Sequence, residues 1–476
     1  MLLAVAALFA PAVPAAPSAN LPPAVRAALD QARIPPSAVA VWVQPLDARQ
    51  PTLAVNAAQP MNPASVMKLV TTFAALEQLG PERTWTTRIA AEAPIKSGML
   101  SGNLYLIGDG DPVLTYERLW RVLRRLRGLG LETVAGDIVL DHAALAFAPL
   151  DPNAFDGKGL RPYNSNGDGL LLHFNAQELA LFPGEQAQAP VRLVAEPPLA
   201  GIRIDNRIVT SARPCEPWYR DLDARLDGNL LTLTGSLPAQ CGPRIWATAP
   251  LPPREFGAAL VQALWRELGG KLRGKVTHGV APAGAKTLLT DESPPLSEIV
   301  RTMNKWSNNV IARQLIAQLG RPAPDAAAPA DMLAVGIEAA RQRLAEADID
   351  IAGMVLVNGA GLSRAARIRA DTLGTLLVRA WQRPWMPEFL ASLPILGRDG
   401  TTRRRLVDSP ARGYAHLKTG TINDVKTVAG YVLDHQGRRH AVVMLVNHPE
   451  AGKSGPSQDA LLEWVWVAGA RSMPLR

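Results

Sequence analysis

Residues 63–80 read PASVMKLVTTFAALEQLG, and this stretch decides the fold of the chain. Its apolar residues recur at helical spacing, and Gly80, which is followed by proline, stops the pattern. We therefore expect a helix from Ala64. The first turn of that helix carries Ser65, which places a hydroxyl group where a helix stabilises negative charge.

Lys68 follows Ser65 by three positions, so the two side chains are expected on one face of the helix and within reach of each other. A serine hydroxyl is a weak nucleophile until a neighbouring group removes its proton. The Lys68 amine can remove it if burial and nearby cations lower its pKa. No other Ser-x-x-Lys sequence occurs in the chain.

Two further motifs follow along the chain. Ser307 and Asn309 interrupt a long helical pattern, and they offer a hydroxyl and an amide for proton transfer and for holding a substrate amide. Lys418, Thr419 and Gly420 lie on an expected strand. There a cation and a hydroxyl can bind a carboxylate, and glycine permits the close approach of a ligand backbone.

Each of these triplets has rivals elsewhere in the chain. Ser-x-Asn recurs at Ser18 and Ser101, and Lys-Ser-Gly occurs at Lys96 and Lys453. The order is more specific than any one triplet: Ser-x-x-Lys on a helix, Ser-x-Asn between helices, then Lys-Thr-Gly on a strand. Together the motifs indicate a penicillin-recognising serine enzyme.

With these motifs the chain resembles the low-molecular-mass class C penicillin-binding proteins, the D-Ala-D-Ala carboxypeptidase/endopeptidase family of the penicillin-binding protein 4 type. The wide separation of Ser65 and Ser307 fits this family, which has nested extra domains, and disfavours a β-lactamase of ordinary size. The stretches that carry the resemblance are 103–112, 304–309, 359–364, 399–401 and 416–431.

The resemblance implies a serine-type D-Ala-D-Ala carboxypeptidase that acts on peptidoglycan stem peptides, and it leaves DD-endopeptidase action on cross-links open. Ser65 would carry the acyl-enzyme, Lys68 would accept its proton, and β-lactams would inhibit by acylating Ser65. The oxyanion hole would use the backbone N–H groups of Ser65 and Thr421. The implied catalytic residues are Ser65, Lys68, Ser307 and Asn309, and the implied substrate-binding residues are Lys418, Thr419, Gly420, Thr421, Arg364 and Asn423.

Two of these residues have a narrower implied role. By resemblance, Arg364 and Asn423 would line a pocket for the D-centre of a diaminopimelate side chain, although a structural ion pair is an equally good interpretation of Arg364. Residues 161–164 of the inserted region would complete that pocket. We take Asp168 as the candidate for its acidic residue.

The resemblance implies an α/β (α+β) fold of the penicillin-binding protein/β-lactamase-like class. Between residues 93 and 284 the sequence changes to short β-like runs punctuated by Gly and Pro, which indicates a β-rich insertion of two smaller domains. The transpeptidase-like domain would then comprise residues 17–92 and 285–476. Antiparallel strands are expected at 413–418, 428–432 and 441–446, and a final helix near Gln458.

Three features concern the compartment. Residues 1–16 are uncharged, largely apolar and end in small residues, which is typical of a signal peptide, with a disordered apolar tail as the alternative. Cys215 and Cys241 could form a disulfide in an oxidising space or remain buried thiols. No later run is long enough for a transmembrane helix. We expect an exported, periplasmic protein that is soluble or peripherally attached to the membrane.

Composition excludes several other classes. With 476 residues, 47% apolar and 19% charged, the chain can bury large cores and is not a disordered protein. Its net charge of +8 comes with no nucleic-acid motif, and no helical His-x-x-x-His or Cys-x-x-Cys supports a zinc peptidase. No cofactor or metal is expected. A β-lactam-hydrolysing enzyme and a non-catalytic cell-wall binding protein remain as alternatives.

Overall fold

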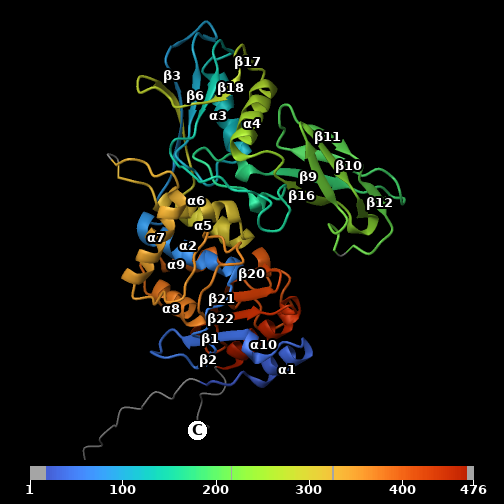
Figure 1. The fold of residues 1–476 in the computed structure, drawn as a ribbon, viewed down its shortest axis with the longest axis vertical. Coiled ribbons are helices and arrows are strands. Elements are labelled where there is room, and N and C mark those ends of the chain that lie inside the picture. Colours follow the sequence, from blue (N-terminus) through green and yellow to red (C-terminus); the bar gives the residue numbers. More distant parts are fainter. Residues whose placement is uncertain (1–17, 216, 324–325, 469–476) are drawn as a thin grey trace, which may run out of the picture.

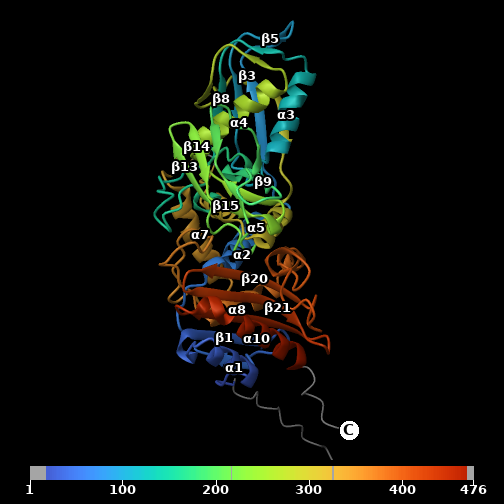
Figure 2. The same ribbon diagram turned by 90° about the vertical axis from the view of Figure 1, so that its right-hand side faces the viewer.

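The computed structural model describes residues 18–215, 217–323 and 326–468 (Figure 1). An α/β body, formed by residues 18–85 and 293–468, occupies one end of an elongated molecule, and two β-rich modules occupy the other (Figure 2). The expected signal peptide at 1–16 lies outside the described residues.

The body is built on a sheet with the strand order β2-β1-β22-β21-β20, in which every pair is antiparallel. Its β22 is apolar without alternation, because both faces of the sheet are covered. Val443 and Leu445 enter one core, whereas Val442 and Met444 enter the other. The strands are β1 (Val39–Pro45), β2 (Leu53–Val55), β20 (Ala415–Ile422), β21 (Val425–Leu433) and β22 (Arg439–Asn447).

Helices cover both faces of this sheet. The expected carboxy-terminal strands are confirmed, and the final helix begins at Gly455, slightly earlier than expected. One face packs on α1 (Pro23–Gln31) and α10 (Gly455–Ala468). The larger core, on the other face, includes α2 (Lys68–Leu79), α5 (Leu296–Trp306), α6 (Asn309–Leu319), α7 (Met332–Glu346), α8 (Ala370–Trp381) and α9 (Met386–Ser392).

The first module contains a sheet of order β18-β8-β6-β3-β19, and apolar residues of α3 and α4 pack into its core. A smaller sheet, β17-β7-β5-β4, lies in the same module. The elements are β3 (Thr86–Ala91), β4 (Ile95–Lys96), β5 (Met99–Leu100), β6 (Leu104–Ile107), α3 (Tyr116–Gly128), β7 (Thr133–Val134), β8 (Ile138–Asp141), α4 (Pro253–Glu267), β17 (Lys271–Leu272), β18 (Val276–His278) and β19 (Lys286–Glu292).

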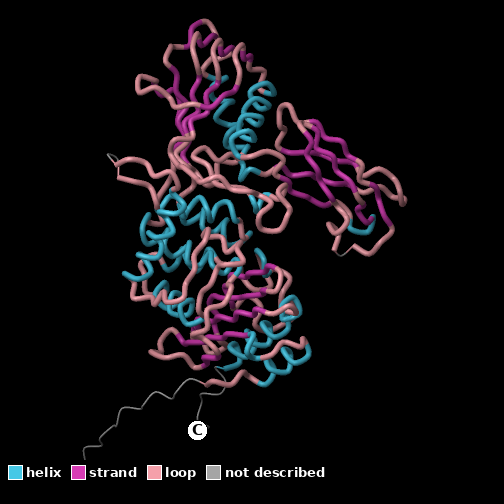
Figure 3. The backbone as a smooth tube through the Cα atoms, in the orientation of Figure 1, coloured by secondary structure: helices cyan, strands magenta, loops and turns pink. Residues whose placement is uncertain are grey.

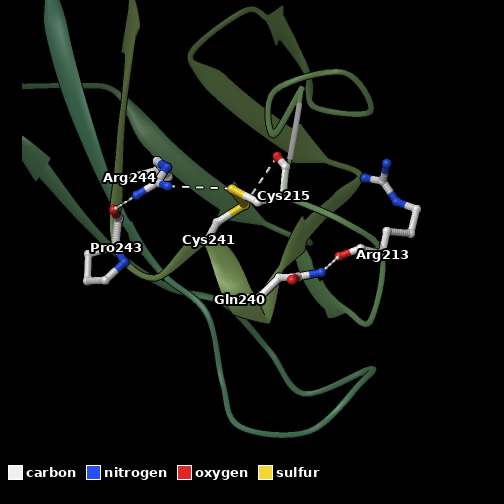
Figure 4. Close-up of a disulfide and its surroundings, with 6 residues drawn as sticks. All are labelled: Arg213, Cys215, Gln240, Cys241, Pro243 and Arg244. Atoms are coloured by element: carbon white, nitrogen blue, oxygen red, sulfur yellow. Dashed lines mark hydrogen bonds between the residues drawn. A yellow bond between two sulfur atoms is a disulfide. The ribbon is translucent and has the colours of Figure 1, made fainter. Parts of the chain in front are cut away.

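The second module projects to one side in Figure 1 and consists almost wholly of strands and loops (Figure 3). Cys215 and Cys241 form a disulfide inside it, with their Cα atoms 4.9 Å apart (Figure 4). The strands are β9 (Gln177–Phe182), β10 (Arg192–Glu196), β11 (Arg203–Asn206), β12 (Val209–Ser211), β13 (Asp223–Asp227), β14 (Leu230–Thr234), β15 (Ser236–Pro238) and β16 (Arg244–Thr248).

The domain boundaries at 92/93 and 284/285 stay a prediction. Strands β3 and β19 lie just outside the expected insertion, yet they pair with each other and belong to the sheet of the first module. Sheet hydrogen bonding ties them to the module, so we propose that the insertion extends from about β3 to β19.

Candidate active site

Ser65 lies in a 3₁₀ turn, η2 (Ala64–Met67), that leads directly into α2. The helix expected from Ala64 therefore starts as the tighter form, in which residues i and i+3 lie above one another, and this brings Ser65 over Lys68. Ala64 has φ 46°, a left-handed conformation that is costly for a residue with a side chain. Asn62 supports this turn, because its Oδ1 accepts the Ala64 N–H at 2.9 Å.

Lys68 is fully buried next to Ser65. Its Nζ lies 3.0 Å from Ser65 Oγ, 2.7 Å from Asn309 Oδ1 and 2.8 Å from the Ala360 carbonyl oxygen. The last two oxygens can only accept hydrogen bonds. A neutral amine satisfies both with its two N–H groups and keeps its lone pair for the hydroxyl hydrogen of Ser65.

Three buried basic side chains lie in or beside the cleft: Lys68, Lys418 and Arg313. Burial first, and then the positive charges of Lys418 and Arg313, hold the pKa of Lys68 well below its ordinary value. Burial also lowers the pKa of Lys418, to about 7. A lysine in such surroundings is suited to accept a proton from a hydroxyl group.

Ser307 lies at the break between α5 and α6, in the left-handed region with φ 58°. Its Oγ accepts a hydrogen bond from Lys418 Nζ at 2.9 Å. Asn308 caps α6 by accepting the Ile311 N–H at 3.0 Å, so that Asn309 opens the helix and faces Lys68. The helical break expected from the sequence is confirmed.

Strand β20 runs beside the Ser65 turn at the edge of the sheet. Gly420 makes this approach possible, because a Cβ atom there would lie 2.7 Å from the Pro63 carbonyl oxygen and 2.8 Å from the Ser65 nitrogen. Thr427 on β21 holds the same turn by donating to the Pro63 oxygen at 2.7 Å. The backbone of Thr421 follows Gly420 along this edge.

Thr419 precedes Gly420 on β20 and contacts the loop that contains Thr401. Its hydroxyl donates to the Thr401 hydroxyl at 2.9 Å, and the Lys418 amine donates to the Thr419 carbonyl at 2.7 Å. The candidate substrate-binding residues 418–421 therefore lie in one line, from the Ser307 hydroxyl to the Ser65 amide.

Arg364 and Asn423 meet beyond the carboxy-terminal end of β20. Arg364 donates to the Asn423 carbonyl at 2.8 Å, and its guanidinium lies 5.2 Å from the ring centroid of Phe155 in the inserted region. Arg364 forms no ion pair within the described residues, which argues against the structural interpretation of this residue. Asp156, next to Phe155, accepts the Tyr163 hydroxyl at 2.8 Å.

The role of Asp168 stays a prediction, and its contacts in the structure are with His142 and with α6. Its side chain is buried and is bound to His142, and its N–H donates to Gln314 of α6 at 3.1 Å. Asp168 therefore joins the first module to the body, and we propose Asp156, which follows Phe155, as an alternative candidate for the acidic residue near Arg364. The sequence spacing from residues 161–164 could not distinguish the two carboxylates.

Residues 21–465 match the D-Ala-D-Ala carboxypeptidase 3 (S13) family. The chain belongs to this family. The D-alanyl-D-alanine carboxypeptidase of an Actinomadura species is 32% identical over 419 residues, which cover 84% of this chain and 76% of that protein. D-alanyl-D-alanine carboxypeptidase DacB of Haemophilus influenzae is 26% identical and covers 82% and 81% of the two chains.

The crystal structure of penicillin binding protein 4 from Haemophilus influenzae matches this S13 peptidase with a TM-score of 0.75, at 24% identity. The match covers 93% of this chain and 99% of that chain. The family match confirms the resemblance expected from the sequence, and this structural match confirms the expected α/β fold class. No helix in the described part of this S13 peptidase is long and apolar enough to cross a membrane.

Sequence patterns did not identify two residues of the site. Arg313 is buried in α6 and donates to the backbone carbonyls of Tyr163 and Ser165, so it ties the inserted region to the surroundings of Lys68 and Ser65. Its signal was the single charged residue in a helix whose other side chains are uncharged. The Ala360 carbonyl, which contacts Lys68, left no side-chain signal in the sequence.

Proposed function

We propose that this S13 peptidase is a serine-type D-Ala-D-Ala carboxypeptidase whose acyl-enzyme forms on Ser65. The observation that carries the assignment is the fully buried Lys68 amine, 3.0 Å from Ser65 Oγ and lowered in pKa. Burial converts an ordinary lysine into a proton acceptor, which is what a serine nucleophile requires. The family match independently supports the reaction class.

In the acylation step, Lys68 takes the proton from Ser65 as Oγ attacks the carbonyl of the penultimate D-Ala. The backbone N–H groups of Ser65 and Thr421 receive the developing negative charge. The C–N bond then breaks, and the proton that Lys68 took from Ser65 passes through the Ser307 hydroxyl to the leaving amine, which returns Lys68 to its neutral form. Water finally hydrolyses the ester, with Lys68 accepting a proton from that water.

Substrate binding uses the positive side of the cleft. The charged form of Lys418, together with the Thr419 hydroxyl, binds the terminal carboxylate of the substrate. Asn309 holds a substrate amide, and the pair Arg364 and Asn423 binds the diamino-acid side chain on the other side of the scissile bond. Penicillin, which also presents a carboxylate beside a reactive amide, acylates Ser65 in the same way.

The test is mass spectrometry of the purified protein after exposure to benzylpenicillin, together with D-Ala release from a disaccharide-pentapeptide. Wild type should carry one stable adduct on the Ser65 peptide and release D-Ala, and Ser65→Ala should do neither. Rapid drug turnover without an adduct would identify a β-lactam-hydrolysing enzyme. Absence of adduct, turnover and D-Ala release together would identify a non-catalytic cell-wall binding protein.

The proposed substrate and the disulfide both indicate the cellular compartment of the protein. We infer export to the periplasm, where peptidoglycan is accessible and the Cys215–Cys241 disulfide is stable. Fractionation of cells that express the full chain tests this inference. Recovery of the protein in the cytoplasm with both thiols reduced would refute it.

A further inference from the structure

A loop of residues 393–402 follows α9 and lies against the end of β20 that is proposed to bind the substrate carboxylate. The N–H group of Leu417 on β20 donates to the Pro394 carbonyl at 2.8 Å. Leu417 directly precedes Lys418 and Thr419, the two residues to which the carboxylate binding is assigned. One side of the loop is therefore fixed to the strand that carries both of them.

An ion pair fixes the other side of the loop to α5. Lys305, whose side chain is buried, donates to Asp399 Oδ2 at 2.6 Å and to the Leu393 carbonyl at 2.7 Å. The other carboxylate oxygen of Asp399 accepts the Ile395 N–H at 2.6 Å. Loss of Asp399 would leave the buried amine without its counter-ion, so the pair holds the loop firmly against the helix.

Gly400 brings the loop into direct contact with the backbone of the same helix. Its φ is 55°, and a Cβ atom there would lie 2.8 Å from the Lys305 carbonyl oxygen and 3.1 Å from Pro394 Cβ. A side chain at this position would therefore push the loop away from α5. The close approach and the ion pair independently hold the loop against the last turn of α5, which is followed by Ser307.

These contacts position two hydroxyl groups. Ser307, two positions beyond the lysine of the ion pair, accepts a hydrogen bond from Lys418 Nζ at 2.9 Å. Thr401, two positions beyond the acid of the ion pair, accepts one from the Thr419 hydroxyl at 2.9 Å. One ion pair thus sets the separation between the partners of the two residues that bind the substrate carboxylate in the proposed function.

Binding of a carboxylate reverses the hydrogen bond between Thr419 and Thr401. A hydroxyl group has one hydrogen to donate, whereas a carboxylate only accepts. In the free site the Thr419 hydroxyl donates to Thr401, and with a substrate it must donate to the carboxylate instead. The Thr419 oxygen is then free to accept, and the Thr401 hydroxyl is the donor within reach. Hydrogen bonds in such a chain polarise and strengthen one another.

We propose that Thr401 is a positioning residue for carboxylate recognition, and that the ion pair of Lys305 and Asp399 acts through it by holding the loop against α5. Thr401 donates to Thr419, which donates to the carboxylate of the stem peptide or of a β-lactam, and Thr401 itself contacts neither ligand. The inference rests on the proposed function and deepens its substrate-binding step. The acyl transfer to Ser65 is unchanged.

The test compares benzylpenicillin with its methyl ester, which keeps the reactive amide and lacks the free carboxylate. Thr401→Val preserves the shape of the side chain without its hydroxyl. It should lower the second-order rate of Ser65 acylation by benzylpenicillin about tenfold and leave the rate with the ester unchanged. For D-Ala release from the disaccharide-pentapeptide, the same loss should appear in KM with kcat close to wild type.

Two further variants serve as controls for the hydroxyl group. Thr401→Ser keeps the hydroxyl and should stay close to wild type with both compounds. Thr302→Val removes a hydroxyl that donates within α5, to the Glu298 carbonyl, and should also leave both rates unchanged.

A double-mutant cycle tests the ion pair. Asp399→Asn removes the counter-ion of Lys305 and keeps an oxygen that can accept the Ile395 N–H. It should lower the benzylpenicillin rate about fivefold, because the loop is held less firmly and Thr401 loses its position. In a Thr401→Val background the same change should cause almost no further loss. Additive losses would overturn the claim that the ion pair acts through Thr401.

Other outcomes separate this inference from the proposed function. Equal losses with the drug and its ester in Thr401→Val, or no loss with either, would overturn the role of Thr401 and leave the acyl-enzyme on Ser65 intact. A loss in Thr401→Ser as large as in Thr401→Val would overturn it too. If the drug and its ester acylate wild type equally fast, carboxylate binding by Lys418 and Thr419 is refuted, and this inference with it. A wild type that neither compound labels would refute the proposed function itself.

Discussion

At the residue scale, the site depends on placing two lysines in one water-poor cleft. Lys68 and Lys418 are each fully buried, so solvent no longer stabilises their charges, and the charge of Lys418 further lowers the pKa of Lys68. Their partners differ. Lys68 faces two carbonyl-type oxygens and a hydroxyl, whereas Lys418 faces the Ser307 hydroxyl and the Thr419 carbonyl at the entrance for a substrate carboxylate.

The pH dependence of D-Ala release follows from this difference. Acylation needs neutral Lys68, so kcat/KM should rise as pH increases through the lowered pKa of Lys68. Carboxylate binding needs charged Lys418, so kcat/KM should fall again as pH increases through about 7. A bound carboxylate favours the charged amine, so the alkaline limb of kcat should lie at higher pH. A kcat/KM that keeps rising to pH 9 would contradict the role of Lys418.

Arg313 affects the same equilibrium without touching the substrate. Its charge helps to lower the pKa of Lys68, so Arg313→Met should raise that pKa and move the acid limb of the kcat/KM profile to higher pH. The change also leaves the Tyr163 and Ser165 carbonyls without their donor, at a stability cost of about 1–3 kcal/mol. An unshifted acid limb in a folded variant would show that Arg313 is purely structural. Arg124→Met, which changes an exposed arginine of α3, is the control.

At the scale of elements, the site is a junction between a tight turn and a strand edge. The η2 turn carries Ser65, and β20 approaches it closely only because position 420 has no side chain. The turn is held by two hydrogen bonds: Asn62 Oδ1 accepts the Ala64 N–H, and the Thr427 hydroxyl donates to the Pro63 carbonyl. Local strain beside Ser65 is therefore compensated by one neighbouring residue and by one residue from a distant strand.

Gly420→Ala tests this junction. Its Cβ atom would force β20 away from Ser65, and a displacement of about 1 Å at reacting groups costs on the order of 100-fold in rate. We expect benzylpenicillin acylation to slow by that factor while the circular dichroism spectrum stays that of wild type. Gly102→Ala is the control, because a Cβ there meets no atom within 4 Å. Acylation at the wild-type rate in Gly420→Ala would refute the close approach.

At the scale of the whole molecule, the body and the second module have separate hydrophobic cores. The larger core of the body includes α2, α5 and α6, which position the catalytic candidates, whereas the second module has a core of its own built around Leu179, Leu181 and Leu231. Among the described residues, these two cores share no side chain. The second module should therefore lose stability without a matching change in the site.

Removal of the disulfide tests this independence. Cys215→Ser combined with Cys241→Ser should lower the stability of the second module by about 2–4 kcal/mol, because the unfolded segment regains chain entropy. The loss is measured by urea unfolding, with the protection of the module's backbone amides from hydrogen exchange as the signal. Benzylpenicillin acylation of Ser65 should stay close to wild type. A parallel loss of acylation would mean that the module supports the catalytic body.

The sequence by itself determined the elements that depend on local pattern. Helical spacing predicted α2, α5, α6 and the break at Ser307, because the periodicity of apolar residues along a helix is a local property of the sequence. The uninterrupted apolar β22 predicted a strand, and the motif order indicated the family. These predictions required no knowledge of which distant segments meet.

Only the tertiary structure decided which distant groups surround Ser65. The buried contacts of Arg313 with the inserted region, and those of Lys68 with Asn309, depend on segments far apart in the chain. Backbone groups such as the Ala360 carbonyl carry no residue-specific signal. The lowered pKa of Lys68 likewise requires burial and neighbouring charges, which exist only once the chain has folded around it.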